Sequence, residues 1–190
     1  QSAFYNPATG KGAQTRFYVT GDENGAGGRM VATDVATGVA YEMFPLTSAG
    51  GSWENGLARP YASDKTVMMC NSDGGANRVF LYIGDKLAKG TPAQRAGLVA
   101  GSFYGIQVQV AGVNLAAESR FGCLNSAVTT VANEANAIYS ASFTLAPVNT
   151  QAGTSFLRPE DGAWDPANPT DRSEEHTSEL QSQFRISYAV

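Results

Sequence analysis

Long hydrophobic runs, a strong net charge and abundant cysteine are all missing from this sequence. No apolar run approaches the roughly 20 residues that a membrane-spanning helix needs. The net charge is only -4, and its sign disfavours nucleic acid and anionic membranes as partners. The two cysteines, Cys70 and Cys123, either form a disulfide in an oxidising compartment or remain buried thiols. We therefore expect neither a membrane span nor a nucleic-acid partner.

Histidine is nearly absent too, and the single one, His176, lies in an unusual C-terminal stretch. Residues 172–182 and 186–190 resemble the in-frame translation of a common short-read sequencing adapter, with residues 183–185 in the place of its index. The alternative is an ordinary polar tail. We expect residues 172–190 to be an artefactual, non-native tail, which leaves residues 1–171 without histidine. Catalytic triads, general bases and metal sites that depend on histidine are then excluded.

Short strands separated by turn residues are the main pattern of what is present. Hydrophobic residues make up 43% of the 190 residues, enough for the core of one domain, and 21 glycines mark many turns. The expected strands cover residues 16–20, 29–35, 39–44, 65–70, 78–83, 103–110 and 154–157. The run at 65–70 is almost continuously apolar, so it should be buried on both faces. Residues 51–56 are expected to form a loop.

Two segments have helical character. Residues 91–97 can form one helical turn, with Thr91 as N-cap and Pro92 at the first helical position. Residues 133–146 are rich in alanine, serine and asparagine, and we expect them to form a helical insertion or a helix packed on the sheet.

The fold class that follows is all-β, with meandering antiparallel sheets. A β-sandwich and a β-propeller both fit, and residues 1–171 would supply about two propeller blades of four strands each. Because the chain begins at Gln1 rather than methionine, we expect it to be processed or cut from a longer protein, so that the propeller domain is incomplete.

Three segments share one plan, in which an apolar strand leads to carboxylates or amides and then to glycine. They are residues 17–25, 67–75 and 156–162. Strands that end at one rim of a sheet would bring Glu23, Asp73 and Glu160 together. Carboxylates gathered without histidine favour a hard cation such as Ca²⁺ or Mg²⁺. The alternative is that these residues are only turn formers.

The last of these segments lies in the densest chemistry of the chain, residues 155–166. In a strand, Arg158 and Glu160 would lie on one face, an arrangement suited to a phosphate held beside a metal-binding carboxylate. The alternative is a structural ion pair of Arg158 with a glutamate or an aspartate. Trp53 and Trp164 are expected to be core or lid residues. Cys70 closes the apolar strand at 65–70, where burial explains it and iron ligation is the sharper option.

Several segments together resemble the bacterial PhoX-type alkaline phosphatase superfamily, in particular its uncharacterised phytase-like β-propeller branch. The segments that carry the resemblance are residues 51–55, 64–67, 79–84, 89–90, 96–98, 103–106 and 156–166. The most specific piece is Phe-Leu-Arg-Pro-Glu-Asp-Gly-Ala-Trp-Asp-Pro. The resemblance implies a six-bladed propeller, export to the periplasm or the outside of the cell, and a rim site that binds Ca²⁺ and Fe³⁺ and hydrolyses phosphate monoesters.

The resemblance also assigns roles to single residues. Arg158 matches a phosphate-binding arginine, Glu160 a metal-binding glutamate, and Cys70 falls near an iron ligand. Glu23, Glu54 and Asp73 are proposed metal ligands from their placement alone. The family pattern has glutamates after that cysteine and a Thr-Pro-Trp-Gly-type segment before it, whereas this chain has Asn-Ser-Asp and Pro-Tyr-Ala-Ser-Asp. These departures favour the alternative of a non-catalytic, calcium-stabilised propeller that acts as a structural or binding module.

Overall fold

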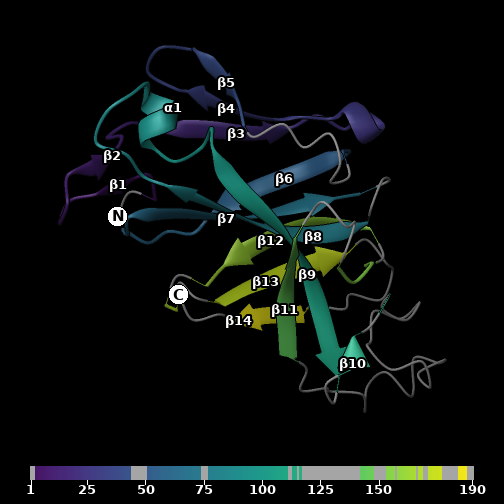
Figure 1. Cartoon of the computed structure of the whole chain (residues 1–190). Coiled ribbons are helices and arrows are strands. Elements are labelled where there is room, and N and C mark those ends of the chain that lie inside the picture. Colours follow the sequence, from purple (N-terminus) through teal and green to yellow (C-terminus); the bar gives the residue numbers. More distant parts are fainter. Residues whose placement is uncertain are drawn as a thin grey trace.

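The chain forms stacked antiparallel sheets (Figure 1). The computed structural model describes residues 3–43, 51–73, 77–110, 113–114, 116, 142–147, 153–156, 158–165, 167–168, 171–176 and 184–187. Within these ranges, helical structure is limited to α1 (Pro92–Arg95) and one 3-10 turn (Gly25–Gly27). The expectation of an all-β fold is confirmed. No helix in the described part is long and apolar enough to cross a membrane.

Four sheets make up the described part of the chain. A small ribbon pairs β1 (Tyr5–Asn6) with β2 (Lys11–Gly12). The next sheet has the order β3 (Phe17–Gly21), β4 (Met30–Asp34), β5 (Ala40–Glu42). The largest sheet has the order β10 (Val113–Asn114), β9 (Gly101–Val110), β8 (Arg78–Asp85), β7 (Lys65–Ser72), β6 (Trp53–Ala58), and β11 (Ser142–Pro147) also pairs with β9. The last sheet has the order β12 (Pro159–Trp164), β13 (Asp171–His176), β14 (Phe184–Ser187).

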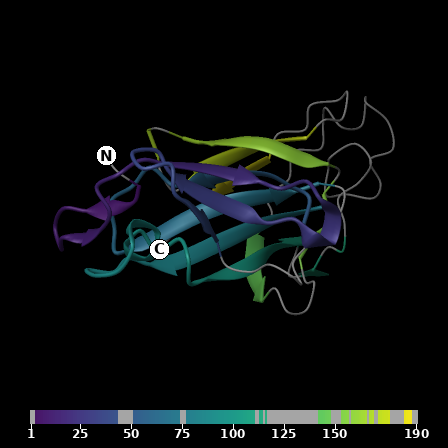
Figure 2. The same cartoon turned by 90° about the horizontal axis from the view of Figure 1, so that it is seen from above.

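The large sheet is the middle layer, and both of its faces are covered. Seen from above, the sheets largely overlap (Figure 2). On one face, Met68 and Cys70 of β7 pack with Met30 of the β3–β5 sheet. On the other face, Met69 of β7 packs in a second cluster that Trp164 of β12 also contacts. Successive side chains of β7 point to opposite faces of the sheet, so they pack into two different cores. This explains why β7 is apolar at successive positions. The expected burial on both faces is confirmed.

Several boundaries follow the predictions closely, and so does the helical turn. The structure places β3, β4, β5, β7, β8 and β9 over the strands expected there. At α1, the Thr91 hydroxyl accepts a hydrogen bond from the Gln94 backbone N–H at 3.2 Å, and the Gln94 side chain accepts one from the Thr91 N–H at 2.9 Å. This is the capping box that the Thr-Pro start predicted in part.

Three local predictions are wrong. Residues 53–58 form β6 rather than a loop, because β7 supplies a partner strand; the absence of a side chain at Gly56 leaves room for Met30 to pack against it. Residues 142–146 belong to β11 rather than a helix, because pairing with β9 overrides their helical character. The remainder of that predicted helix, residues 133–141, lies outside the described residues. In the described part of the expected strand at 154–157, pairing is limited to one backbone bridge at Ser155, and residues 159–164 form β12.

The tail that resembles adapter sequence takes part in backbone pairing. β13 pairs with β12, and β14 pairs with β13. Ladder hydrogen bonds join backbone groups that nearly every residue carries, so an edge strand can accept almost any partner sequence. The pairing is therefore compatible with either origin of residues 172–190.

A buried lysine lies at the end of β8 and leads to a prediction on pH. Lys86 is only 2% exposed, and its ammonium donates a hydrogen bond to the Ser63 carbonyl oxygen at 2.7 Å. Burial, and secondarily the charge of Arg59, lower the pKa of Lys86 to about 8 from 10.5. Below pH 8 the folded state holds a buried charge. Between pH 8 and 10.5 the unfolded chain binds more protons than the folded chain, so Lys86 makes stability rise with pH there.

The free energy of unfolding of the wild type should therefore rise from pH 8 to 9.5 relative to that of a Lys86→Met variant. Urea denaturation at several pH values measures both curves. The variant also loses the hydrogen bond from the Lys86 ammonium to Ser63, so the test compares how the two curves change with pH rather than their absolute heights. Parallel curves would show that Lys86 is not the titrating group.

Candidate functional site

Four acidic residues lie at strand ends or starts close to one another: Glu23, Asp73 and Glu160, which were expected at one rim, and Glu54, which was proposed as a metal ligand from its placement. Glu54 is the second residue of β6, and Asp73 directly follows β7; the register pairs their neighbours Trp53 and Ser72. Glu160 is the second residue of β12, and Glu23 comes shortly after β3. We name the set Glu23, Glu54, Asp73 and Glu160 the acidic rim. These strands meet at the end of the stack away from α1 (Figure 1).

Asn55 ties β12 to β6 at this rim. Its side-chain amide donates a hydrogen bond to the Glu160 carbonyl oxygen and another, of 2.8 Å, to the Asp161 carboxylate. Its own amide oxygen is buried and has no hydrogen-bond partner among the described residues. The role of Asn55 was not predicted, and the only sequence signal for it was its place directly after Glu54.

Arg158 joins two members of the acidic rim. Its Nε lies 3.1 Å from Asp73 Oδ2, and a terminal nitrogen lies 2.8 Å from Glu160 Oε1. The arginine is exposed, whereas the Asp73 side chain is only 13% exposed. The structure thus contains both forms of the structural ion pair weighed as the alternative, arginine with glutamate at Glu160 and arginine with aspartate at Asp73.

The backbone, rather than strand alternation, brings Arg158 to these partners. Arg158 precedes β12 and has a φ of 51°, in the left-handed region that a residue with a Cβ rarely adopts. The two ion pairs help to hold this unfavourable conformation. They also raise the pKa of Arg158, chiefly through the hydrogen bond to Asp73, so the guanidinium stays charged.

The pKa of Glu54 is shifted by the charges of the other acidic-rim residues. Desolvation raises its pKa, and the nearby charges of Glu23, Asp73 and Glu160 raise it further, whereas Arg158 lowers it. Like charges that lie close enough to shift a pKa favour a compensating cation. Arg158 supplies part of that compensation from within the chain.

The described residues contain no group of three or more histidine, cysteine, aspartate or glutamate side chains placed to hold a metal ion. In the acidic rim, Arg158 pairs with Asp73 and Glu160. The carboxylates of the rim are the oxygen donors that Ca²⁺ prefers, and they retain uncompensated charge around Glu54.

Cys70 does not join the rim. It is fully buried in the apolar core, and its Sγ would lie 3.4 Å from a Cβ placed on Gly56. Burial alone therefore accounts for Cys70, and the thiol is separated from the carboxylates by the alternation of β7. Cys123, its possible disulfide partner, lies outside the described residues.

Both tryptophans are packed against the cores, as expected. Trp53 is fully buried, and Trp164 donates a hydrogen bond from its Nε1 to the Leu57 carbonyl oxygen at 2.9 Å. The Trp164 bond holds β12 against β6 beside the rim.

No protein-family model, no curated protein and no solved structure matches the chain.

Proposed function

We propose that the acidic rim and Arg158 form part of a phosphate-ester site that works with a divalent cation, Ca²⁺, in an exported phosphoric monoester hydrolase of the PhoX-like type. The observation that carries the proposal is the position of Arg158, whose guanidinium lies between Asp73 and Glu160 and beside Glu54. A guanidinium fork suits phosphate oxygens, and carboxylates suit a hard cation. Both kinds of group that such a site needs are therefore adjacent.

The residues of this chain would divide the work as follows. Arg158 binds two oxygens of the phosphate and stabilises charge that develops on them. Asp73 and Glu160 aim the guanidinium and, with Glu54 and Glu23, would hold the cation. The cation supplies further charge neutralisation when it is bound. We give Cys70 no role as an Fe³⁺ ligand, because its side chain lies in the apolar core.

We propose further that the stacked sheets are blades of a β-propeller. The middle sheet is covered by β3–β5 on one face and by β12 on the other, which is how successive blades pack around an axis. β13 and β14 fall almost wholly in the expected non-native tail, so within residues 1–171 only β12 would belong to a third blade. The strands of these blades would then place their ends at one rim, where β7 ends and β6 and β12 begin. A β-sandwich would need only two such layers.

Hydrolysis of p-nitrophenyl phosphate tests the proposed reaction directly. The full-length protein is expected to release p-nitrophenol in the presence of Ca²⁺ and to lose this activity when EGTA is added, with recovery on return of Ca²⁺. Mg²⁺ at the same concentration is the matched control for ionic strength. Absence of turnover under every Ca²⁺ and Fe³⁺ condition would reject the hydrolase.

A second candidate function is a non-catalytic module stabilised by Ca²⁺. It is favoured by one observation, that the Arg158 guanidinium already pairs with Asp73 and Glu160 within the chain, where the hydrolase would need it for phosphate. This candidate predicts a melting temperature that rises with Ca²⁺ and no hydrolysis. A melting temperature that does not respond to Ca²⁺ would count against both candidates.

A further inference from the structure

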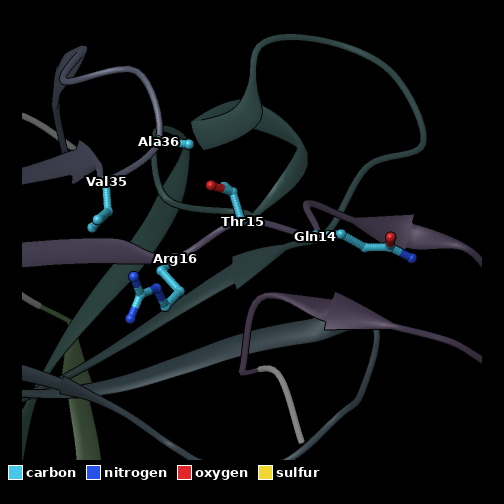
Figure 3. A pocket seen from close by; sticks show the side chains of 5 residues that line it. All are labelled: Gln14, Thr15, Arg16, Val35 and Ala36. Atoms are coloured by element: carbon cyan, nitrogen blue, oxygen red, sulfur yellow. The ribbon is translucent and has the colours of Figure 1, made fainter.

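A second concave site lies far along β3 and β4 from the acidic rim. A cavity of about 500 Å³ is lined by Gln14, Thr15, Arg16, Val35 and Ala36 (Figure 3). It is open to solvent, since four of the five lining residues are exposed and only Thr15 is half-buried. The residues come from the segment just before β3 and from the β4–β5 turn, so one end of this hairpin forms its wall.

Arg16 and Val35 stand side by side on the outer face of this hairpin. The Val35 backbone N–H donates to the Arg16 carbonyl oxygen at 2.9 Å, which continues the β3–β4 register beyond the pair Phe17 and Asp34. Directly opposite residues of an antiparallel pair project to the same face. Figure 3 shows the guanidinium of Arg16 and the side chain of Val35 extending in the same direction.

The charge of Arg16 is uncompensated within the described residues, where it forms no ion pair. The neighbouring carboxylate, Asp34, is 3% exposed and turned away from the solvent. It accepts hydrogen bonds from the Thr15 hydroxyl at 2.8 Å and from the Ala36 N–H at 2.9 Å, and these bonds lower its pKa. The Asp34 carboxylate thus has its hydrogen bonds within the protein, and Arg16 is the charged side chain that faces the cavity.

Solvent-exposed apolar side chains lie next to the Arg16 guanidinium. Val35 is 49% exposed, and Tyr18, two residues after Arg16 and on the same face of β3, is 64% exposed. Exposed apolar side chains beside a guanidinium fork fit a ligand with an anionic group and an apolar body.

We propose that this cavity binds a small organic anion, with its carboxylate or phosphate group on the Arg16 guanidinium and its apolar body on Val35 and Ala36. The site is separate from the acidic rim and does not depend on the proposed hydrolase. The two sites also differ in the sign of the charge they present. Arg16 can attract an anion directly, whereas the acidic rim would need a bound cation to do so.

Titration with benzoate, followed by NMR of the backbone amides of residues 14–16 and 35–36, tests the proposal. Benzoate is expected to cause saturable shifts, and Arg16→Gln is expected to weaken its binding by at least about tenfold, as loss of a charge-assisted pair implies. Benzyl alcohol, which has the ring without the charge, and inorganic phosphate, which has charge without the ring, should both bind more weakly than benzoate.

Arg29→Gln is the matched control, because Arg29 is an exposed arginine of the same sheet that already lies 3.8 Å from Glu42. It should leave benzoate binding unchanged. Arg16 is exposed, so Arg16→Gln should preserve the fold, and the amide spectrum outside the cavity verifies this. The proposal is overturned if benzoate gives no saturable shift, if Arg16→Gln binds it equally well, or if phosphate binds as tightly as benzoate.

Discussion

Replacement of Trp53 by alanine is expected to lower the free energy of unfolding by about 3–5 kcal/mol, the range for truncating a buried tryptophan or phenylalanine. Trp53 is fully buried, with its ring centroid 5.3 Å from that of Phe80 and 5.9 Å from that of Phe103. Its indole nitrogen has no hydrogen-bond partner in the described part of the chain, so the loss is one of packing alone. The cavity would open between the β3–β5 sheet and the middle sheet.

Urea denaturation of wild type and variant measures this difference, provided that the dependence on urea is unchanged. Tyr18→Ala serves as the control, since Tyr18 is 64% exposed and its loss should change stability by no more than about 0.5 kcal/mol. Trp53→Phe should fall between the two. A loss below about 1 kcal/mol for Trp53→Ala would mean that the two sheets do not share a core there.

Replacement of Arg158 by glutamine is expected to reduce kcat/KM for p-nitrophenyl phosphate by ~100-fold or more, the size of effect seen when one donor to a developing oxyanion is removed. Glutamine keeps much of the length but lacks the charge and the fork. The free energy of unfolding should also fall, because the variant leaves the Asp73 carboxylate, whose side chain is only 13% exposed, without its ionic partner; kcat/KM is therefore measured on protein verified to be folded.

A second readout does not depend on catalysis. Arg158 lowers the pKa of Glu54, so that pKa should rise further in Arg158→Gln, which a pH titration of the Glu54 carboxyl carbon by NMR measures. Arg29→Gln, at an arginine paired with Glu42, is the control for both experiments. If the pKa of Glu54 rises but kcat/KM is unchanged, the electrostatic contact between Arg158 and Glu54 is confirmed and a role of Arg158 in the reaction is rejected.

Local features of the fold could be predicted where short-range physics decides them. Thr91 and Pro92 specify a helix start whatever surrounds them, and the apolar run of β7 needs burial on both sides in any all-β fold. β6 and β11 were missed because their own sequences do not favour strands. They become strands through partners that lie elsewhere in the chain, β7 and β9.

The candidate site divides in the same way. The sequence named Glu23, Glu54, Asp73, Glu160 and Arg158 as chemistry-bearing residues, and the fold brings them into electrostatic reach of one another. Alternation along a strand was the wrong reason for the pairing of Arg158 with Glu160. Cys70 was proposed for the same rim, but the alternation of β7 turns it into the core.

Composition and periodicity along the chain are enough to predict the all-β class, the double burial of β7 and the types of charged group available. Strand register and sheet stacking bring Arg158 to Asp73 and Asn55 to β12, which join residues 85 and 106 positions apart. Arg158 also needs a left-handed backbone to reach its partners, and Arg16 comes to lie beside Val35 through the register of the β3–β4 hairpin. No local pattern encodes that geometry.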